Sequence, residues 1–105
     1  MAINPGLLNK IKTSIRIGHD KLDEDVADDI AACLADLRMV GVQDAKLAVT
    51  EDMDPLILRA VKMYCKANYT DDPVKAARYQ AGYDSLKSSL MMAEGYGHKE
   101  AVSDE

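Results

Sequence analysis

Residues 54–92 read DPLILRAVKMYCKANYTDDPVKAARYQAGYDSLKSSLMM, and within this stretch two aspartates, Asp54 and Asp72, each stand directly before a proline. An aspartate before a helix accepts hydrogen bonds from the free backbone N–H groups of the first turn. A proline at the first helical position has no N–H to leave unsatisfied. We therefore predict two helices, over residues 55–69 and 73–92.

The apolar residues of the two helices are distributed differently. In residues 55–69 they cover most of the circumference, which is typical of a central helix that contacts other elements on two faces. Residues 73–92 carry one stripe with spacings of three and four, which favours antiparallel packing on a neighbour. Gly82 within that helix costs about 1 kcal/mol relative to alanine, and a close helix–helix approach is one explanation. The stripe consists of Ala76, Tyr79, Tyr83, Leu86 and Leu90.

Two further helices are predicted in the first half of the chain. Asn4-Pro5 repeats the capping pattern and begins a helix over residues 5–16, with Gly18 as its stop. Residues 23–40 form a clear amphipathic helix, with an acidic first turn that suits the helix dipole and Gly41 at its end. Residues 41–53 are a connection, with a short extended piece over residues 47–49.

The fold class is therefore all-α, a compact bundle of about four helices with a flexible C-terminal tail. Residues 1–92 form the helical domain, and the polar, glycine-interrupted residues 93–105 form the tail. Met63 is predicted to be a core residue. Met91 and Met92 either end the last helix or contact a partner, because methionines adapt to partner surfaces.

Composition limits the functional classes. The chain has 105 residues, a net charge of −5, and neither Phe nor Trp. Such a small, thin core gives modest stability, so association with further copies would help. Tight DNA binding needs clustered cations, which the negative charge argues against. The two cysteines lack CxxC spacing and are expected to be buried free thiols of a reducing compartment. Neither a membrane span nor a signal peptide is visible.

The charges are unevenly placed along the chain, with a basic segment before an acidic one. The simpler interpretation is two solvated helix surfaces with charges that match the helix dipoles. The alternative is that the basic patch of one subunit contacts the acidic patch of the next. The residues predicted for that contact are Lys10, Lys12 and Arg16 on one side and Asp25, Asp28 and Asp29 on the other.

No catalytic constellation is recognisable. The chain has two histidines, and neither His19 nor His98 has a cysteine or carboxylate at ligand spacing on a regular element. The HExxH, Walker, GxGxxG and nucleophile-elbow motifs are absent. We therefore expect that the protein is not an enzyme and holds neither a cofactor nor a metal ion.

The second half of the chain resembles the small head–tail connector proteins of long-tailed bacteriophages, which are also described as DNA-packaging or head-completion proteins. In that pattern a helix that opens with Asp-Pro is followed by a polar turn, a second helix with spaced Tyr, Leu and Lys, and a Gly-Tyr tail. The resemblance covers residues 23–97. The matching residues are Asp54, Pro55, Ala60, Val61, Lys62, Tyr64, Tyr83, Leu86, Lys87, Leu90, Gly95 and Tyr96.

The resemblance implies a dodecameric ring beneath the portal of the filled capsid. The ring extends the DNA channel, lets DNA pass without specific binding, and offers a platform for the next stopper or tail-completion protein. The tail would reach onto the portal protein, with Tyr96 as its anchor between Gly95 and Gly97. The expected location is the head–tail interface of the virion, after synthesis in the host cytoplasm, and the solution state can be monomeric.

Two alternatives stay open at the level of sequence. One is a small helix-turn-helix DNA-binding regulator, which needs an exposed basic recognition helix. The helix over residues 55–69 has three cations, Arg59, Lys62 and Lys66, but its apolar surround predicts burial. The other is a helical interaction module that binds a single protein partner.

Overall fold

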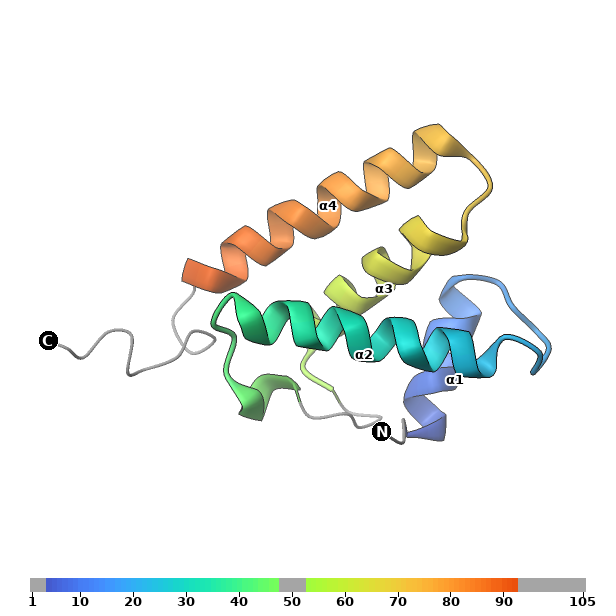
Figure 1. Cartoon of the computed structure of the whole chain (residues 1–105), viewed down its shortest axis with the longest axis horizontal. Helices are drawn as coiled ribbons and strands as arrows, with labels where there is room; N and C mark the ends of the chain where they lie inside the picture. The colour runs from blue at the N-terminus through green and yellow to red at the C-terminus, as the bar shows by residue number, and fades with distance from the viewer. Residues whose placement is uncertain (1–3, 48–52, 93–105) are drawn as a thin grey trace, which may run out of the picture.

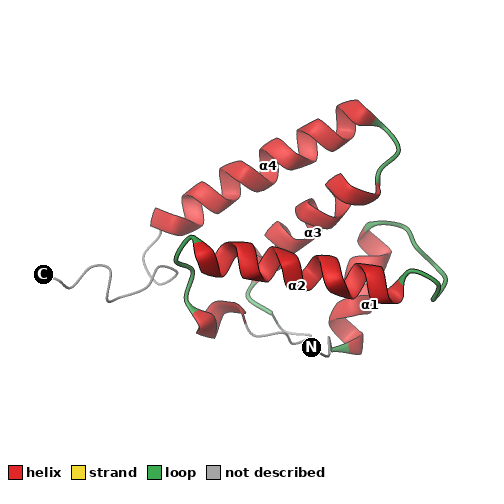
Figure 2. Cartoon of the chain, viewed as in Figure 1, coloured by secondary structure: helices red, strands yellow, loops and turns green. Residues whose placement is uncertain are grey.

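The computed structural model describes residues 4–47 and 53–92, and within these ranges it contains four α-helices, one short 3-10 helix and no strand (Figures 1 and 2). This confirms the all-α prediction. The predicted flexible tail, residues 93–105, lies outside the described residues. The elements are α1 (Pro5–Ser14), α2 (Asp23–Met39), η1 (Asp44–Leu47), α3 (Pro55–Tyr69) and α4 (Pro73–Met92).

Three of the four helices begin as the Asx-Pro pairs predict. The Asn4 side chain accepts hydrogen bonds from the backbone N–H groups of the first turn of α1, at 2.8 and 3.2 Å. Asp54 does the same for α3 at 3.1 and 3.3 Å, and Asp72 for α4 at 2.9 and 3.4 Å. The predicted bounds of α3 and α4 are confirmed, and these caps explain why both helices begin where they were predicted to begin.

The first two helices end in the same type of turn, with different residues at its left-handed position. Gly41 follows α2 with a φ of 104°, as predicted. The corresponding residue after α1 is Arg16, with a φ of 63°. The Ile17 N–H then donates to the Lys12 carbonyl at 2.9 Å, which closes the turn. The predicted stop at Gly18 is therefore wrong, because the chain already reverses at Arg16.

The helix α3 lies at the centre of the bundle and contacts α1, α2 and α4, which confirms the predicted central position (Figure 1). α4 returns antiparallel along it after the turn at residues 70–72. The core residues with the lowest exposure come from all four helices and include Leu7, Ile11, Ile30, Leu37, Ile57, Val61, Tyr83 and Leu90.

Two details of the packing bear on the sequence predictions. A Cβ on Gly82 would lie 3.1 Å from the Met63 sulfur, so this glycine does mark a close approach of α4 to α3. Met63 itself is half-buried and packs against the core cluster. In the connection, Leu47 belongs to η1 and not to an extended piece, while the rest of that predicted piece, residues 48–49, lies outside the described residues.

Candidate assembly surfaces

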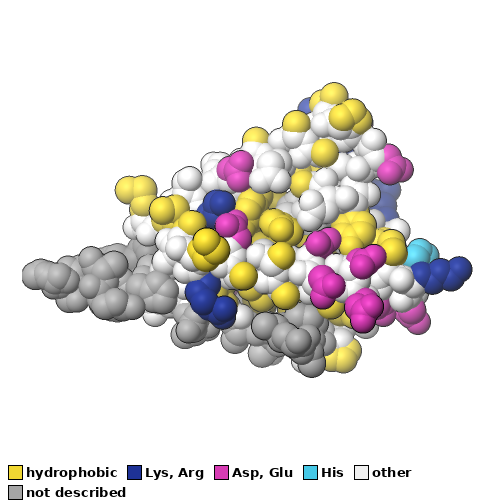
Figure 3. All heavy atoms as spheres, in the orientation of Figure 1, with side chains coloured by type: hydrophobic (Ala, Val, Ile, Leu, Met, Phe, Trp, Pro, Cys, Tyr) yellow, Lys and Arg dark blue, Asp and Glu magenta, His cyan; other side chains and the backbone are white. Residues whose placement is uncertain are grey.

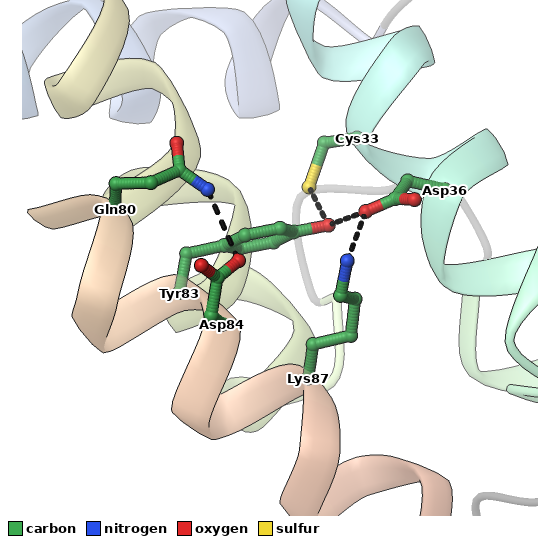
Figure 4. A network of polar contacts seen from close by, with 6 residues as sticks. All are labelled: Cys33, Asp36, Gln80, Tyr83, Asp84 and Lys87. Atoms are coloured by element: carbon green, nitrogen blue, oxygen red, sulfur yellow. Dashed lines mark hydrogen bonds and ion pairs between the residues drawn. The ribbon is translucent and has the colours of Figure 1, made fainter.

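A small polar network joins α2 to α4 (Figure 4). The Tyr83 hydroxyl donates to the Asp36 carboxylate at 2.7 Å, and the Lys87 ammonium donates to the same oxygen at 3.0 Å. The Cys33 thiol donates to the Tyr83 hydroxyl at 3.8 Å. The Lys87 ammonium also lies 5.3 Å from the centre of the Tyr83 ring.

The surroundings of the network keep its groups in fixed protonation states. The hydrogen bond from Tyr83, together with Lys87, lowers the pKa of Asp36. Burial raises the pKa of Tyr83, and it raises the pKa of Cys33 to about 12. The carboxylate is therefore an anionic acceptor, while the hydroxyl and the thiol stay protonated as donors. This arrangement stabilises helix packing and supplies no activated nucleophile.

The residues of the connector-like pattern mostly hold the helices together. Asp54 caps α3 and Pro55 begins it. The Tyr64 ring meets the Tyr83 ring edge-on, with centroids 5.3 Å apart. Leu86 packs against the core, Leu90 is buried, and Lys87 belongs to the polar network. Sequence reasoning missed the partners of this group on α2, because Asp36 and Cys33 lie about fifty positions away from it.

The basic segment predicted from the sequence is divided by the structure. The Lys12 side chain is largely buried, and its ammonium pairs with Asp23 at 2.7 Å and Asp20 at 3.1 Å. The hydrogen bond to Asp23 raises the pKa of Lys12 despite the opposing effect of burial. This cation thus ties α1 to the start of α2 within one subunit. Lys10 and Arg16, the other two predicted basic residues, are exposed.

The acidic residues gather over the first half of α2 (Figure 3). Glu24, Asp25 and Asp28 are exposed, and we call these three residues the acidic face. Asp29 is half-buried and lies close to Tyr69, whose pKa is raised by burial first and by Asp29 second. The predicted contact between basic and acidic residues of neighbouring subunits remains a prediction.

A hollow of about 270 Å³ lies where the ends of α1 and α3 meet the start of α4. Three cations line it, and we call it the basic hollow: Arg16, Lys66 and Lys75. Its other lining residues are mostly hydroxyl-bearing: Ser14, Tyr69, Thr70 and Tyr79, with Ile15. Sequence analysis missed this site because its residues come from three separate elements, and only Arg16 stood in the predicted basic segment.

The helices α2 and α4 end at the same side of the molecule, and the chain continues into residues 93–105 from there (Figure 1). Large apolar side chains are exposed at this end. Met39 is 84% exposed, Met91 47% and Met92 87%. The predicted portal contacts Gly95, Tyr96 and Gly97 lie outside the described residues.

In the described part of the chain, no group of three or more His, Cys, Asp or Glu residues is placed to hold a metal ion. None of the helices there combines the length and the apolar character that crossing a membrane requires.

Comparison with known protein families gives a match over most of the chain. The sequence profile of a family described as "Phage connector protein" matches residues 7–97, which include most of α1 and all of α2, α3 and α4. No curated protein and no solved structure matches the chain.

Proposed function

Because the chain belongs to the phage connector protein family, we propose that it is the head–tail connector, or adaptor, of its particle. Copies of the chain form a ring beneath the portal of the filled capsid. The ring extends the DNA channel and provides the platform for a stopper or tail-completion protein. The observation that carries this proposal is the family match, which extends from α1 to residue 97, into the segment that follows α4.

The charge of the chain supports a channel that does not retain DNA. A net charge of −5 gives long-range repulsion from phosphates, so DNA passes without specific binding. In this proposal the protein works at the head–tail interface of the virion, after synthesis in the host cytoplasm, and the ring is dodecameric.

We assign the portal contact to the end of the molecule where Met39, Met91 and Met92 are exposed. Flexible, polarizable methionine side chains suit a surface that is covered on assembly. The segment after α4 starts at this end, and its Tyr96, between two glycines, would insert into the portal surface.

The DNA-binding regulator has less support from the fold. A recognition helix must offer a free face to the major groove. The cationic helix that the alternative requires is α3, and α3 is packed against three other helices. Of its three cations, only Arg59 is exposed, while Lys62 and Lys66 are half-buried.

The proposal is tested by mixing the full-length chain with the portal protein of the same phage and imaging the particles by electron microscopy. We expect ring-shaped complexes with the full chain and none with a version that ends at Ala93. A Met92→Ser variant keeps residues 93–105. It therefore distinguishes the contribution of the exposed methionines to portal binding from the contribution of the tail.

Binding that survives the truncation keeps the connector function and moves the contact onto the helices. If neither form binds the portal, the connector proposal fails, and a module that binds a different single partner takes its place.

A further inference from the structure

We propose that the basic hollow binds carboxylate side chains from the acidic face of a second copy of this chain. The inference rests on the proposed ring and names the surfaces through which its neighbours would meet. The proposed contact differs from the one predicted from sequence in its basic residues. Lys66 and Lys75 are added to Arg16. Lys12 is omitted because it forms ion pairs with Asp20 and Asp23 of its own subunit.

Among the described residues of the subunit, the three cations of the hollow have no carboxylate partner at ion-pair distance. Lys12, Lys46 and Lys87 each pair with a carboxylate at 4 Å or less. In the part of the chain that the structure describes, no ion pair of this kind involves Arg16, Lys66 or Lys75. Lys66 lies 5.6 Å from the centre of the Tyr79 ring, a neutral partner that leaves its positive charge available.

The shape and lining of the hollow suit an oxyanion. Its volume of about 270 Å³ accommodates one or two carboxylate groups. Ser14, Thr70 and Tyr79 also line the hollow, and their hydroxyl groups can donate hydrogen bonds to the same oxygens. Hydrogen bonds from a cation to a carboxylate are the stronger kind.

The backbone at Arg16 adds an argument for the side chain itself. The turn after α2 has the same hydrogen-bond pattern and uses Gly41, which adopts a positive φ without steric cost. The turn after α1 places an arginine at that position, at a φ of 63°. Glycine would form this turn without strain, so the turn itself does not require an arginine. The position of the guanidinium at the hollow accounts for the strained residue.

The acidic face supplies the complementary surface. Glu24, Asp25 and Asp28 are exposed, and in the described residues they form no ion pair. Three cations neutralise too few phosphates to hold DNA against a net charge of −5, whereas they match three carboxylates. Two unlike surfaces on one chain give a head-to-tail contact, which can close into a ring.

The contact is tested by zero-length carbodiimide cross-linking, which joins a lysine amine to a carboxylate only where they touch. An equal mixture of ¹⁴N- and ¹⁵N-labelled chains, with and without portal, is cross-linked and digested for mass spectrometry. We expect mixed-isotope peptides that join Lys66 or Lys75 to Asp25 or Asp28. Cross-links from these lysines to portal carboxylates alone would overturn the inference.

Charge-reversal variants provide a second test of the contact. Lys75→Glu, at an exposed position, should weaken self-association or ring assembly at least tenfold, while the control Arg59→Glu, which lies outside the hollow, leaves it unchanged. Mixing Lys75→Glu with Asp25→Lys/Asp28→Lys should restore the contact. Circular dichroism of each variant verifies the fold.

The outcomes separate this inference from the connector function. Rings on the portal that are indifferent to Lys75→Glu would overturn the role of the hollow and keep the connector. Loss of binding to a 20-base-pair DNA duplex in Lys75→Glu, with unchanged self-association, would show that the hollow takes phosphate and would overturn the proposed carboxylate partner. If the portal is not bound at all, cross-linking of the chain alone still decides whether the hollow meets the acidic face.

Discussion

The Tyr83 hydroxyl on α4 lies 2.7 Å from the Asp36 carboxylate on α2, although the two residues are 47 positions apart. Lys87 reaches the same carboxylate oxygen one turn later on α4. Neither α2 nor α4 follows the other directly in the chain, so this network links two helices that no short loop connects.

The Tyr83→Phe substitution removes the hydroxyl and keeps the buried ring. We expect the free energy of unfolding to fall by about 1–2 kcal/mol, because a hydrogen bond to a charged group is lost. Urea denaturation followed by circular dichroism measures this change. Tyr64→Phe is the matched control, since in the described residues the Tyr64 hydroxyl has no hydrogen-bond partner. An equal loss in both variants would show that the Tyr83–Asp36 bond adds little.

The same carboxylate predicts how stability depends on pH. Its pKa in the folded protein is lowered from the ordinary value of 3.8, first by the Tyr83 hydrogen bond and then by Lys87. The resulting stabilisation is fully present above pH 3.8 and is lost as the pH falls through the lower, folded pKa. The free energy of unfolding should therefore decrease on acidification below that pH. In Asp36→Asn this part of the decrease should be missing, and an unchanged acid profile would contradict the prediction.

Local sequence signals predict most of the helical bundle. Asn4, Asp54 and Asp72 cap the helices that follow, and the apolar stripes identify α3 as central and α4 as its antiparallel neighbour. These predictions succeeded because caps and stripes act within a few residues. The end of α1 was misplaced because the expected glycine at the left-handed position is an arginine, which propensity does not favour there.

The assembly surfaces were less accessible to sequence reasoning. Lys12 reads as a surface cation, and only the fold shows that it is buried beside Asp23. The basic hollow combines residues from α1, α3 and α4, so no spacing of residues within a single segment predicts it. Both depend on how separate helices come together.

The two cysteines provide a probe of the core. Cys33 and Cys65 are fully buried, and burial raises the pKa of each thiol to about 12. Since the thiolate is the reactive form, neither should react with a disulfide reagent in the native protein at pH 8. Both should react once urea unfolds the chain, which a colorimetric thiol assay measures. Rapid native labelling of Cys33 would mean that α2 and α4 separate readily.

Gly82 offers a test of the α3–α4 contact. The added methyl group of Gly82→Ala favours the helix by about 1 kcal/mol, but it would lie 3.1 Å from the Met63 sulfur. Because the methionine side chain is flexible, it should shift, and we expect a net gain of about 0.5 kcal/mol. In a Met63→Ala background the full gain of about 1 kcal/mol should appear. Equal gains in both backgrounds, measured by urea denaturation, would show that Met63 does not limit the approach.

The Arg16→Gly substitution separates stability from assembly. Glycine adopts the left-handed conformation without the steric cost of about 1–2 kcal/mol that other residues carry, although it loses more backbone freedom on folding. We expect the variant to be more stable by about 0.5 kcal/mol in urea denaturation, while ring assembly becomes weaker because the hollow loses its guanidinium. The reverse change, Gly41→Ala at a φ of 104°, should destabilise the protein by about 1 kcal/mol and leave the hollow intact. If Arg16 served only the turn, its replacement by glycine would not weaken assembly. A gain of stability with unchanged assembly would therefore mean that this arginine has no role between subunits.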